Sequence, residues 1–187
     1  MTLIFAGLLL WTLVHWTPAL FPGIKTRWKN TLGPGAYQGS FALLIISALV
    51  LIVLGWRSTP PEHVYQPMLS WRHPAMGLVV VGFILMGAAN YASRLKAWLR
   101  HPQLTGFMLW ATAHLLLNGD HKSVLVFSWM LLWAGSEILL INRRDGRWQA
   151  PEVVSWPKEI LGVLVSLGVV ALVVWLHPYL SGRHVVL

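Results

Sequence analysis

The chain contains no cysteine among its 187 residues. This absence excludes disulfide bonds, thiolate-ligated heme, cysteine-bound iron–sulfur clusters and catalytic thiols. Any metal chemistry must therefore use histidine, carboxylate or methionine side chains as ligands.

Charged residues are scarce as well. Asp, Glu, Lys and Arg make up 11% of the chain and hydrophobic residues 56%, whereas a soluble domain carries roughly 25% charged residues. The shortfall indicates that lipid surrounds much of the protein. The connections between the apolar runs are too short to hold a soluble core, so we expect residues 1–187 to form a single transmembrane domain.

Several apolar runs are long enough to cross about 30 Å of hydrocarbon at about 1.5 Å per helical residue. They cover residues 2–21, 37–56, 74–91, 102–118, 123–141 and 159–176. The runs are continuous rather than alternating, and in lipid the backbone must satisfy its own hydrogen bonds. The sequence therefore predicts an all-α fold, an integral membrane six-helix bundle. The first run lacks the basic n-region and cleavage site of a signal peptide, so we expect it to remain as a helix.

Lysine and arginine are distributed unevenly around these runs. Ten of the 14 Lys and Arg residues lie in the connections after the first, third and fifth runs, which the positive-inside rule places in the cytoplasm. We therefore predict an N-out/C-out topology. The net charge of +8 is then a topology signal and an attraction to anionic membrane lipid. Short basic clusters of this kind do not form the basic face typical of nucleic-acid binding.

Two histidines lie inside predicted membrane helices in matching contexts, His15 in LWTLVH and His114 in LWATAH. Ionisable side chains are costly in lipid, so such residues usually have a function, although one of them could simply hydrogen-bond a neighbouring helix. Imidazole binds zinc, copper and heme iron alike. A structural zinc site normally needs four protein ligands, whereas heme needs only one or two axial histidines. We therefore predict that His15 and His114 ligate a heme iron.

Further residues are candidates for contacts with this cofactor. Trp110 and Asn118 lie four residues before and after His114, on the same helix face. Heme propionates would need cations near an interface, for which Arg27 and Arg100 are candidates together with Arg94. Each of these arginines could equally be only a topology determinant.

Three other positions have weaker indications. Glu137 is a candidate buried carboxylate that could accept a hydrogen bond from a ligand imidazole. Asp120 is predicted to cap the helix that begins near Ser123. His101 precedes a proline at a helix start, where we expect a surface role. The remaining histidines fall in loops or the tail and receive no role: His63, His73, His177 and His184.

The segment RHPQLTGFMLWATAHLLLNGD, residues 100–120, resembles the signature of the NnrU family of bacterial membrane proteins. The blocks HWTPALFPGIKTRW and LGPGAYQGSFAL near the N-terminus are also similar to that family. The resemblance covers most of the chain and implies a multi-pass protein of the bacterial inner (cytoplasmic) membrane.

The resemblance also implies a cofactor. The family includes the 15-cis-ζ-carotene isomerase, a heme b protein that isomerises a polyene with bis-histidine iron. Its motif ligand falls on His114, and its N-terminal ligand falls on His15, although the H-S-G-x-A-x-x-R pattern that follows in the isomerase is absent here. Bacterial members are linked with nitrite and nitric oxide reduction. The implied function is a redox-gated isomerase of an apolar isoprenoid or polyene, or a heme protein supporting nitrite or nitric oxide reduction.

Two alternatives remain open. RHPQLTG is similar to the R-H-P-x-Y-x-G element of S-adenosylmethionine-dependent membrane methyltransferases, although Leu104 replaces the tyrosine. The chain could also be a non-enzymatic assembly factor, with components of a respiratory reductase as partners. The residues alone do not decide whether the protein is an enzyme.

Overall fold

The protein is built from helices throughout the part that the structure describes, which is residues 1–182 of this computed structural model without the side chain of Leu180. In chain order, the elements are α1 (Thr2–Leu20), α2 (Pro22–Leu32), α3 (Pro34–Ser58), η1 (Leu69–Trp71), α4 (Arg72–Ala88), α5 (Arg94–Trp98), α6 (Pro102–Leu117), α7 (His121–Asp145) and α8 (Trp156–Ser181). The predicted all-α class is confirmed.

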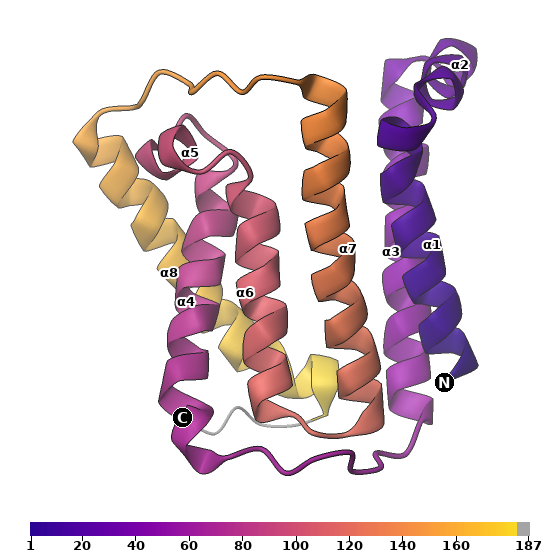
Figure 1. The fold of residues 1–187 in the computed structure, drawn as a ribbon, viewed down its shortest axis with the longest axis vertical. Coiled ribbons are helices and arrows are strands. Elements are labelled where there is room, and N and C mark those ends of the chain that lie inside the picture. The colour runs from indigo at the N-terminus through magenta and orange to yellow at the C-terminus, as the bar shows by residue number, and fades with distance from the viewer. Residues whose placement is uncertain (183–187) are drawn as a thin grey trace.

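The long helices form two antiparallel pairs joined by a central helix (Figure 1). α1 packs against α3 and α4 packs against α6, while α7 stands between the pairs and contacts both α1 and α6. α8 crosses obliquely behind the second pair, against α4. The short helices α2 and α5 lie at the upper end in this view.

Five of the described helices are long and apolar enough to cross a membrane: α1, α3, η1 with α4, α7 and α8. The remaining predicted run forms α6, whose 16 residues extend about 24 Å at 1.5 Å per residue, less than the ~30 Å of a hydrocarbon core. Large apolar side chains cover the outside of the bundle, as Leu43, Leu132 and Trp175 show with 63%, 74% and 67% exposure. A surface of this kind is matched to lipid, and the chain is a multi-pass membrane protein.

Helix ends differ from the sequence prediction where proline is involved. The last apolar run is predicted to stop at residue 176, ahead of Pro178. In the structure α8 instead continues through Pro178 to Ser181. It ends at Gly182, whose φ of 74° and ψ of 9° are left-handed and whose amide donates to the Pro178 carbonyl at 2.8 Å. His177 is therefore helical.

The α4–α6 pair is held at close range by glycine. A Cβ atom on Gly82 would lie 2.7 Å from the Gly106 carbonyl oxygen, and one on Gly106 would meet the Gly82 carbonyl. Membrane helices have little hydrophobic drive to associate, so close backbone packing through small residues is a main source of their cohesion. Gly106 is also the glycine of the RHPQLTG segment.

The connection between α3 and η1 is fastened to the turn between α6 and α7. The amides of Val64 and Tyr65 donate to the Gly119 carbonyl at 2.7 and 3.1 Å, and the His121 amide donates to the Glu62 carbonyl at 2.8 Å. A Cβ on Gly119 would collide with the Tyr65 carbonyl. The turn therefore requires glycine at this position.

Lys122, in the first turn of α7, closes the end of α3. Its Nζ donates to the carbonyls of Trp56 and Thr59, both at 2.9 Å, and lies over the Trp56 ring at 4.9 Å from the centroid. A cation at a helix C-terminus interacts favourably with the helix dipole. The start of α7 and the end of α3 are thereby joined.

Replacing Gly82 with alanine should lower the unfolding midpoint in detergent, because the added methyl group meets the α6 backbone. We expect a loss of about 1–3 kcal/mol, which is typical of overpacking. Gly77 lies on the same helix with open space at its Cβ position, so Gly77→Ala should be neutral or stabilising by about 0.5–1 kcal/mol. Equal midpoints for the two variants would contradict the close contact.

Candidate functional site

His114 is half-buried near the C-terminal end of α6, where the helix backbone fixes its tautomer. Its Nδ1 lies 2.8 Å from the carbonyl oxygen of Trp110. A carbonyl oxygen can only accept, so Nδ1 must carry the proton and donate. The neutral ring then presents the lone pair of Nε2. This is the usual arrangement of metal-ligating histidines, whose second nitrogen is held by a hydrogen bond.

His15 has the same local arrangement on α1. Its Nδ1 donates to the Trp11 carbonyl at 2.8 Å, so the repeated L-W-x-x-x-H element forms the same hydrogen bond in both helices. The His15 ring contacts the rings of Trp133 and Phe41, at centroid distances of 4.8 and 5.6 Å. Both histidines are therefore prepared to act as ligands through Nε2.

A cavity of about 480 Å³ lies beside His114. This volume falls within the range of small-molecule and cofactor sites, about 300–1,000 Å³. Side chains from α3, η1, α4, α6, α7 and α8 line it, and most are apolar; the polar side chains among them belong to Arg72, His114, Asn118, His177 and Ser181. Such a lining suits a large apolar ligand that carries a few polar groups.

Trp110 and Asn118, both predicted cofactor contacts, line the cavity together with His114. The Trp110 and Phe127 rings pack on His114 at centroid distances of 4.7 and 4.4 Å. The Asn118 amide group donates to the His114 carbonyl at 3.0 Å, as does the Asn118 backbone amide at 2.9 Å. These contacts fix the helix turn that carries the imidazole.

His15 does not line this cavity. α1 and α6 run in opposite directions (Figure 1), and each histidine lies in the C-terminal half of its helix, so the two lie towards opposite ends of the bundle. A chain of ring contacts connects them through Trp133, Phe107 and Trp110. The described residues include no direct contact between the two imidazoles.

The predicted propionate partners also lie away from the cavity. Arg27 is exposed on α2, and Arg100 precedes α6 at the opposite end of that helix from His114. The cation that does line the cavity is Arg72, the first residue of α4. Sequence reasoning missed it because Arg72 is one of the few basic residues on the predicted outer side.

Sequence reasoning also missed His177, which lines the same cavity from α8. Its ring centroid is 6.4 Å from that of His114. The prediction that the last helix ends at residue 176 left His177 in the tail. The spacing of His177 and Ser181 at i and i+4, followed by a glycine, was the available signal that the helix continues.

Buried polar groups without partners gather around His15. The indole nitrogens of Trp11 and Trp133 make no hydrogen bond within residues 1–182, and both rings contact the His15 ring. Glu137 is 8% exposed, and its Oε2 likewise has no partner among the described residues. Within residues 1–182 Glu137 makes no hydrogen bond to His15 or His114, so its predicted hydrogen bond to a ligand imidazole stays a prediction.

A family model described as NnrU protein matches residues 3–185. The chain belongs to the NnrU family. No curated protein and no solved structure matches it.

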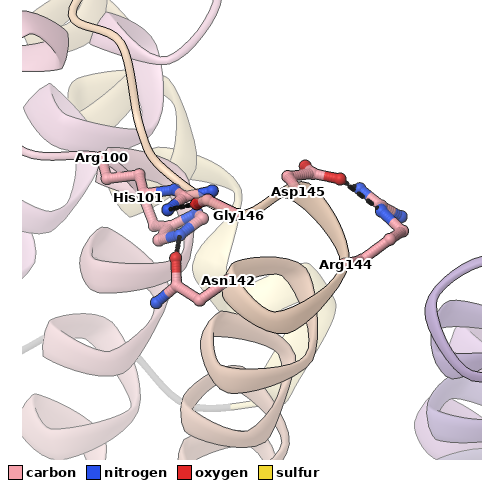
Figure 2. A network of polar contacts seen from close by, with 6 residues as sticks. All are labelled: Arg100, His101, Asn142, Arg144, Asp145 and Gly146. Atoms are coloured by element: carbon pink, nitrogen blue, oxygen red, sulfur yellow. Dashed lines mark hydrogen bonds and ion pairs between the residues drawn. The ribbon is translucent and has the colours of Figure 1, made fainter.

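In this NnrU protein the first residues of the 100–120 segment join α6 to the end of α7 (Figure 2). Nη1 of Arg100 donates to the Gly146 carbonyl at 2.7 Å, and Nε2 of His101 hydrogen-bonds Oδ1 of Asn142 at 2.8 Å. His101 is half-buried, so the expected surface role is replaced by an interhelical contact.

The last residue of that segment begins α7. Asp120, 1% exposed, is the N-cap: Oδ1 accepts from the Ser123 amide and Oδ2 from the Ser123 hydroxyl, both at 3.0 Å. The predicted cap is confirmed, and the helix begins at His121 rather than at Ser123. A carboxylate here also complements the positive end of the helix dipole.

Tyr65 fastens the loop before η1 to the end of α6, because its hydroxyl donates to the carbonyls of Leu115 and Asn118, the latter at 3.0 Å. Burial, followed by the Asp120 carboxylate, raises the pKa of Tyr65 above its ordinary value near 10. The neutral phenol is thus favoured in the folded protein. The hydrogen-bonded phenol therefore adds to the free energy of unfolding below its ordinary pKa. This contribution is lost as the pH rises through the raised pKa of the folded protein.

Tyr65→Phe should therefore lower stability by about 1 kcal/mol at neutral pH, the usual net value of a hydrogen bond. The difference from wild type should shrink above pH 10, since a phenolate cannot donate. Unfolding midpoints measured across this pH range test both points. Tyr37→Phe is the control, because the Tyr37 hydroxyl has no hydrogen bond within residues 1–182 and its ring packs on Trp28. A constant difference up to the highest pH would contradict the assignment.

Proposed function

We propose that this NnrU protein is a heme b-binding integral membrane protein in which His114 is an axial ligand. The observation that carries the proposal is the His114 imidazole, which is held through Nδ1 by the Trp110 carbonyl beside an apolar cavity of about 480 Å³. A porphyrin supplies four nitrogen ligands of its own, so the protein needs to add only one or two.

The residues around the cavity fit such a group. Aromatic and aliphatic side chains suit a flat macrocycle, and the Trp110 and Phe127 rings lie against the imidazole itself. Arg72 is the basic residue that lines the cavity, and it would pair with a propionate at the cavity edge. The mostly apolar lining would lower the local dielectric constant, which strengthens that charge pairing.

Heme would supply an electron acceptor and donor within the membrane. The chain's own residues would orient the iron through His114, hold a propionate through Arg72 and keep the site apolar. An iron held by two protein ligands would have no open position, and such a group would supply electron transfer or a redox-gated activity rather than direct substrate binding. We therefore favour a redox function that supports nitrite or nitric oxide reduction, with respiratory reductase components as partners.

A redox-gated isomerase related to ζ-carotene isomerase is the second candidate. The apolar cavity lining favours it, because an isoprenoid or polyene chain would find compatible surfaces from α3, α4 and α8 there. For this function the heme would supply a redox switch, and the apolar lining would hold the substrate beside it.

The structure gives less support to methyl transfer. Arg100 and His101 are engaged with Gly146 and Asn142, and Gly106 packs against Gly82, so the RHPQLTG residues serve helix packing. The cavity lining contains no carboxylate among the described residues that could pair with the amino group of S-adenosylmethionine.

The topology completes the proposal. We place α6 as a sixth crossing, shielded from lipid by α4 and α7, which lie on either side of it. The end that bears α2 and α5 would face the cytoplasm of a bacterial inner membrane, in an N-out/C-out arrangement. Lys25, Arg27 and Lys29 on α2 and Arg94 and Lys96 on α5 supply the positive charge at that end.

Purified protein should show a Soret band, and His114→Ala should lose most of the heme, because the variant removes the ligand and leaves the cavity. Heme content per protein, measured by pyridine hemochrome, tests this. His101→Ala is the control on the same helix, since His101 bonds Asn142 at the far end. A colourless wild type after heme supply, or full heme content in His114→Ala, would contradict the proposal.

Arg72→Gln should weaken heme retention by roughly 10- to 150-fold, as expected for the loss of one charge-assisted pair worth about 1.5–3 kcal/mol. The measurement is heme transfer to apomyoglobin. Arg57→Gln is the matched control, because Arg57 is an exposed cation at the end of α3 that does not line the cavity. Equal transfer rates for the two variants would show that Arg72 does not hold a propionate.

A further inference from the structure

We propose that a groove between α4 and α8 binds an anionic phospholipid, with the lipid phosphate beside Lys158 and one acyl chain along the two helices. The inference goes beyond the heme-binding function proposed above and requires no heme, because the groove is a second cavity whose lining includes neither His114 nor Arg72.

This second cavity has a volume of about 760 Å³ and lies where α8 packs on α4. It is lined by both helices, by the turn at Asn90 and Tyr91 that follows α4, and by Val154 ahead of α8. Phe83, in the middle of α4, lines both this groove and the cavity beside His114. The groove therefore continues along the same helix pair towards the end that bears α5 (Figure 1).

One length of the groove is apolar and open to lipid. On α8, Leu161, Val165 and Val169 line it at i, i+4 spacing, so they share one helix face, and all are exposed. From Lys158 to Val169 the helix rises about 16 Å at about 1.5 Å per residue, close to half of the ~30 Å hydrocarbon core. The groove thus has the length of the acyl region of one leaflet.

Lys158 supplies a cation at one end of this apolar length. It lies in the first turn of α8, is exposed and lines the groove one turn before Leu161. Its side chain makes no hydrogen bond or ion pair within residues 1–182. A lysine in such a position can bury its methylene stem against the groove and present its ammonium group to the lipid headgroups.

The acid next to Lys158 in the sequence is engaged elsewhere. Glu159 is buried; its Oε2 accepts from the Arg94 amide at 3.1 Å, and its carboxylate is hydrogen-bonded to the Tyr91 side chain. The Arg94 guanidinium lies over the Trp156 ring at 4.1 Å from the centroid, and its Nε has no partner among the described residues. Two cations against one carboxylate leave positive charge at this end, which complements a phosphate.

An anionic phospholipid matches both parts of the groove. A purely apolar isoprenoid would fill the apolar length but would leave Lys158 without a partner. Anionic lipids are concentrated in the cytoplasmic leaflet, where each basic residue near the surface contributes about 1 kcal/mol to the attraction. In the topology proposed above, the end of the groove that bears Lys158 faces that leaflet.

The test is native mass spectrometry of the full-length, detergent-purified protein mixed with phosphatidylglycerol or with phosphatidylcholine of the same acyl chains. Wild type should retain phosphatidylglycerol preferentially. Lys158→Gln should bind it roughly fivefold more weakly, the equivalent of about 1 kcal/mol for one basic side chain. Lys29→Gln is the control, because Lys29 is an exposed lysine on α2 that does not line the groove.

Val165→Trp tests the acyl chain separately. An indole at this position would occupy the apolar length, so the preferential retention of phosphatidylglycerol should be lost. Leu164→Trp is the matched control, because Leu164 and Val165 are neighbours on α8 with 59% and 57% exposure, and of the two Val165 lines the groove.

Equal retention of the two lipids by wild type would overturn the inference, as would unchanged phosphatidylglycerol binding in Lys158→Gln. Unchanged binding in Val165→Trp would place the lipid outside the groove. Displacement of phosphatidylglycerol from wild type by squalene would assign the groove to an apolar isoprenoid instead. Size-exclusion profiles show whether each variant is folded. Heme content is not the readout, so a failure here leaves the function proposed above standing.

Discussion

Backbone contact between α4 and α6 at Gly82 and Gly106 determines where the rest of the site lies. α6 is the shortest of the long helices, with 16 residues; it carries Trp110 and His114, and Asn118 caps its C-terminal end. Because no side chain separates the two backbones at the crossing, Gly82 and Gly106 lie directly against each other. Arg72 on α4 and His114 on α6 thereby line one cavity, and α8, packed on α4, brings His177 to the same place.

The 100–120 segment that is characteristic of the sequence serves this packing more than it serves chemistry. Arg100 and His101 join α6 to α7, Gly106 permits the close crossing, and Gly119 accommodates the Tyr65 carbonyl. Asp120 starts α7. Trp110, His114 and Asn118 are among the members that line the cavity, and the Trp110 carbonyl holds the His114 imidazole through Nδ1. The packing contacts of this segment together fix the position of the His114 imidazole.

Much of the fold follows from the sequence because lipid solvation imposes simple rules. Long apolar runs must be helical, and the Asp120 cap follows from residue type and position. The positions of the helices relative to one another could not be predicted from the sequence. The repeated L-W-x-x-x-H pattern predicts equal local structure for His15 and His114, which the structure has, but periodicity carries no information on distance between helices. The two residues lie towards opposite ends of the bundle. His177 was missed for another reason: the predicted helix ended at residue 176, five residues before its observed end at Ser181.

The hydrogen bond from Nδ1 of His114 to the Trp110 carbonyl has one more effect. Since the first nitrogen always holds its proton, an incoming proton can attach only at Nε2, the same atom that a metal would occupy. Acid and metal therefore exclude one another at this ring, and each would displace the other in proportion to its concentration.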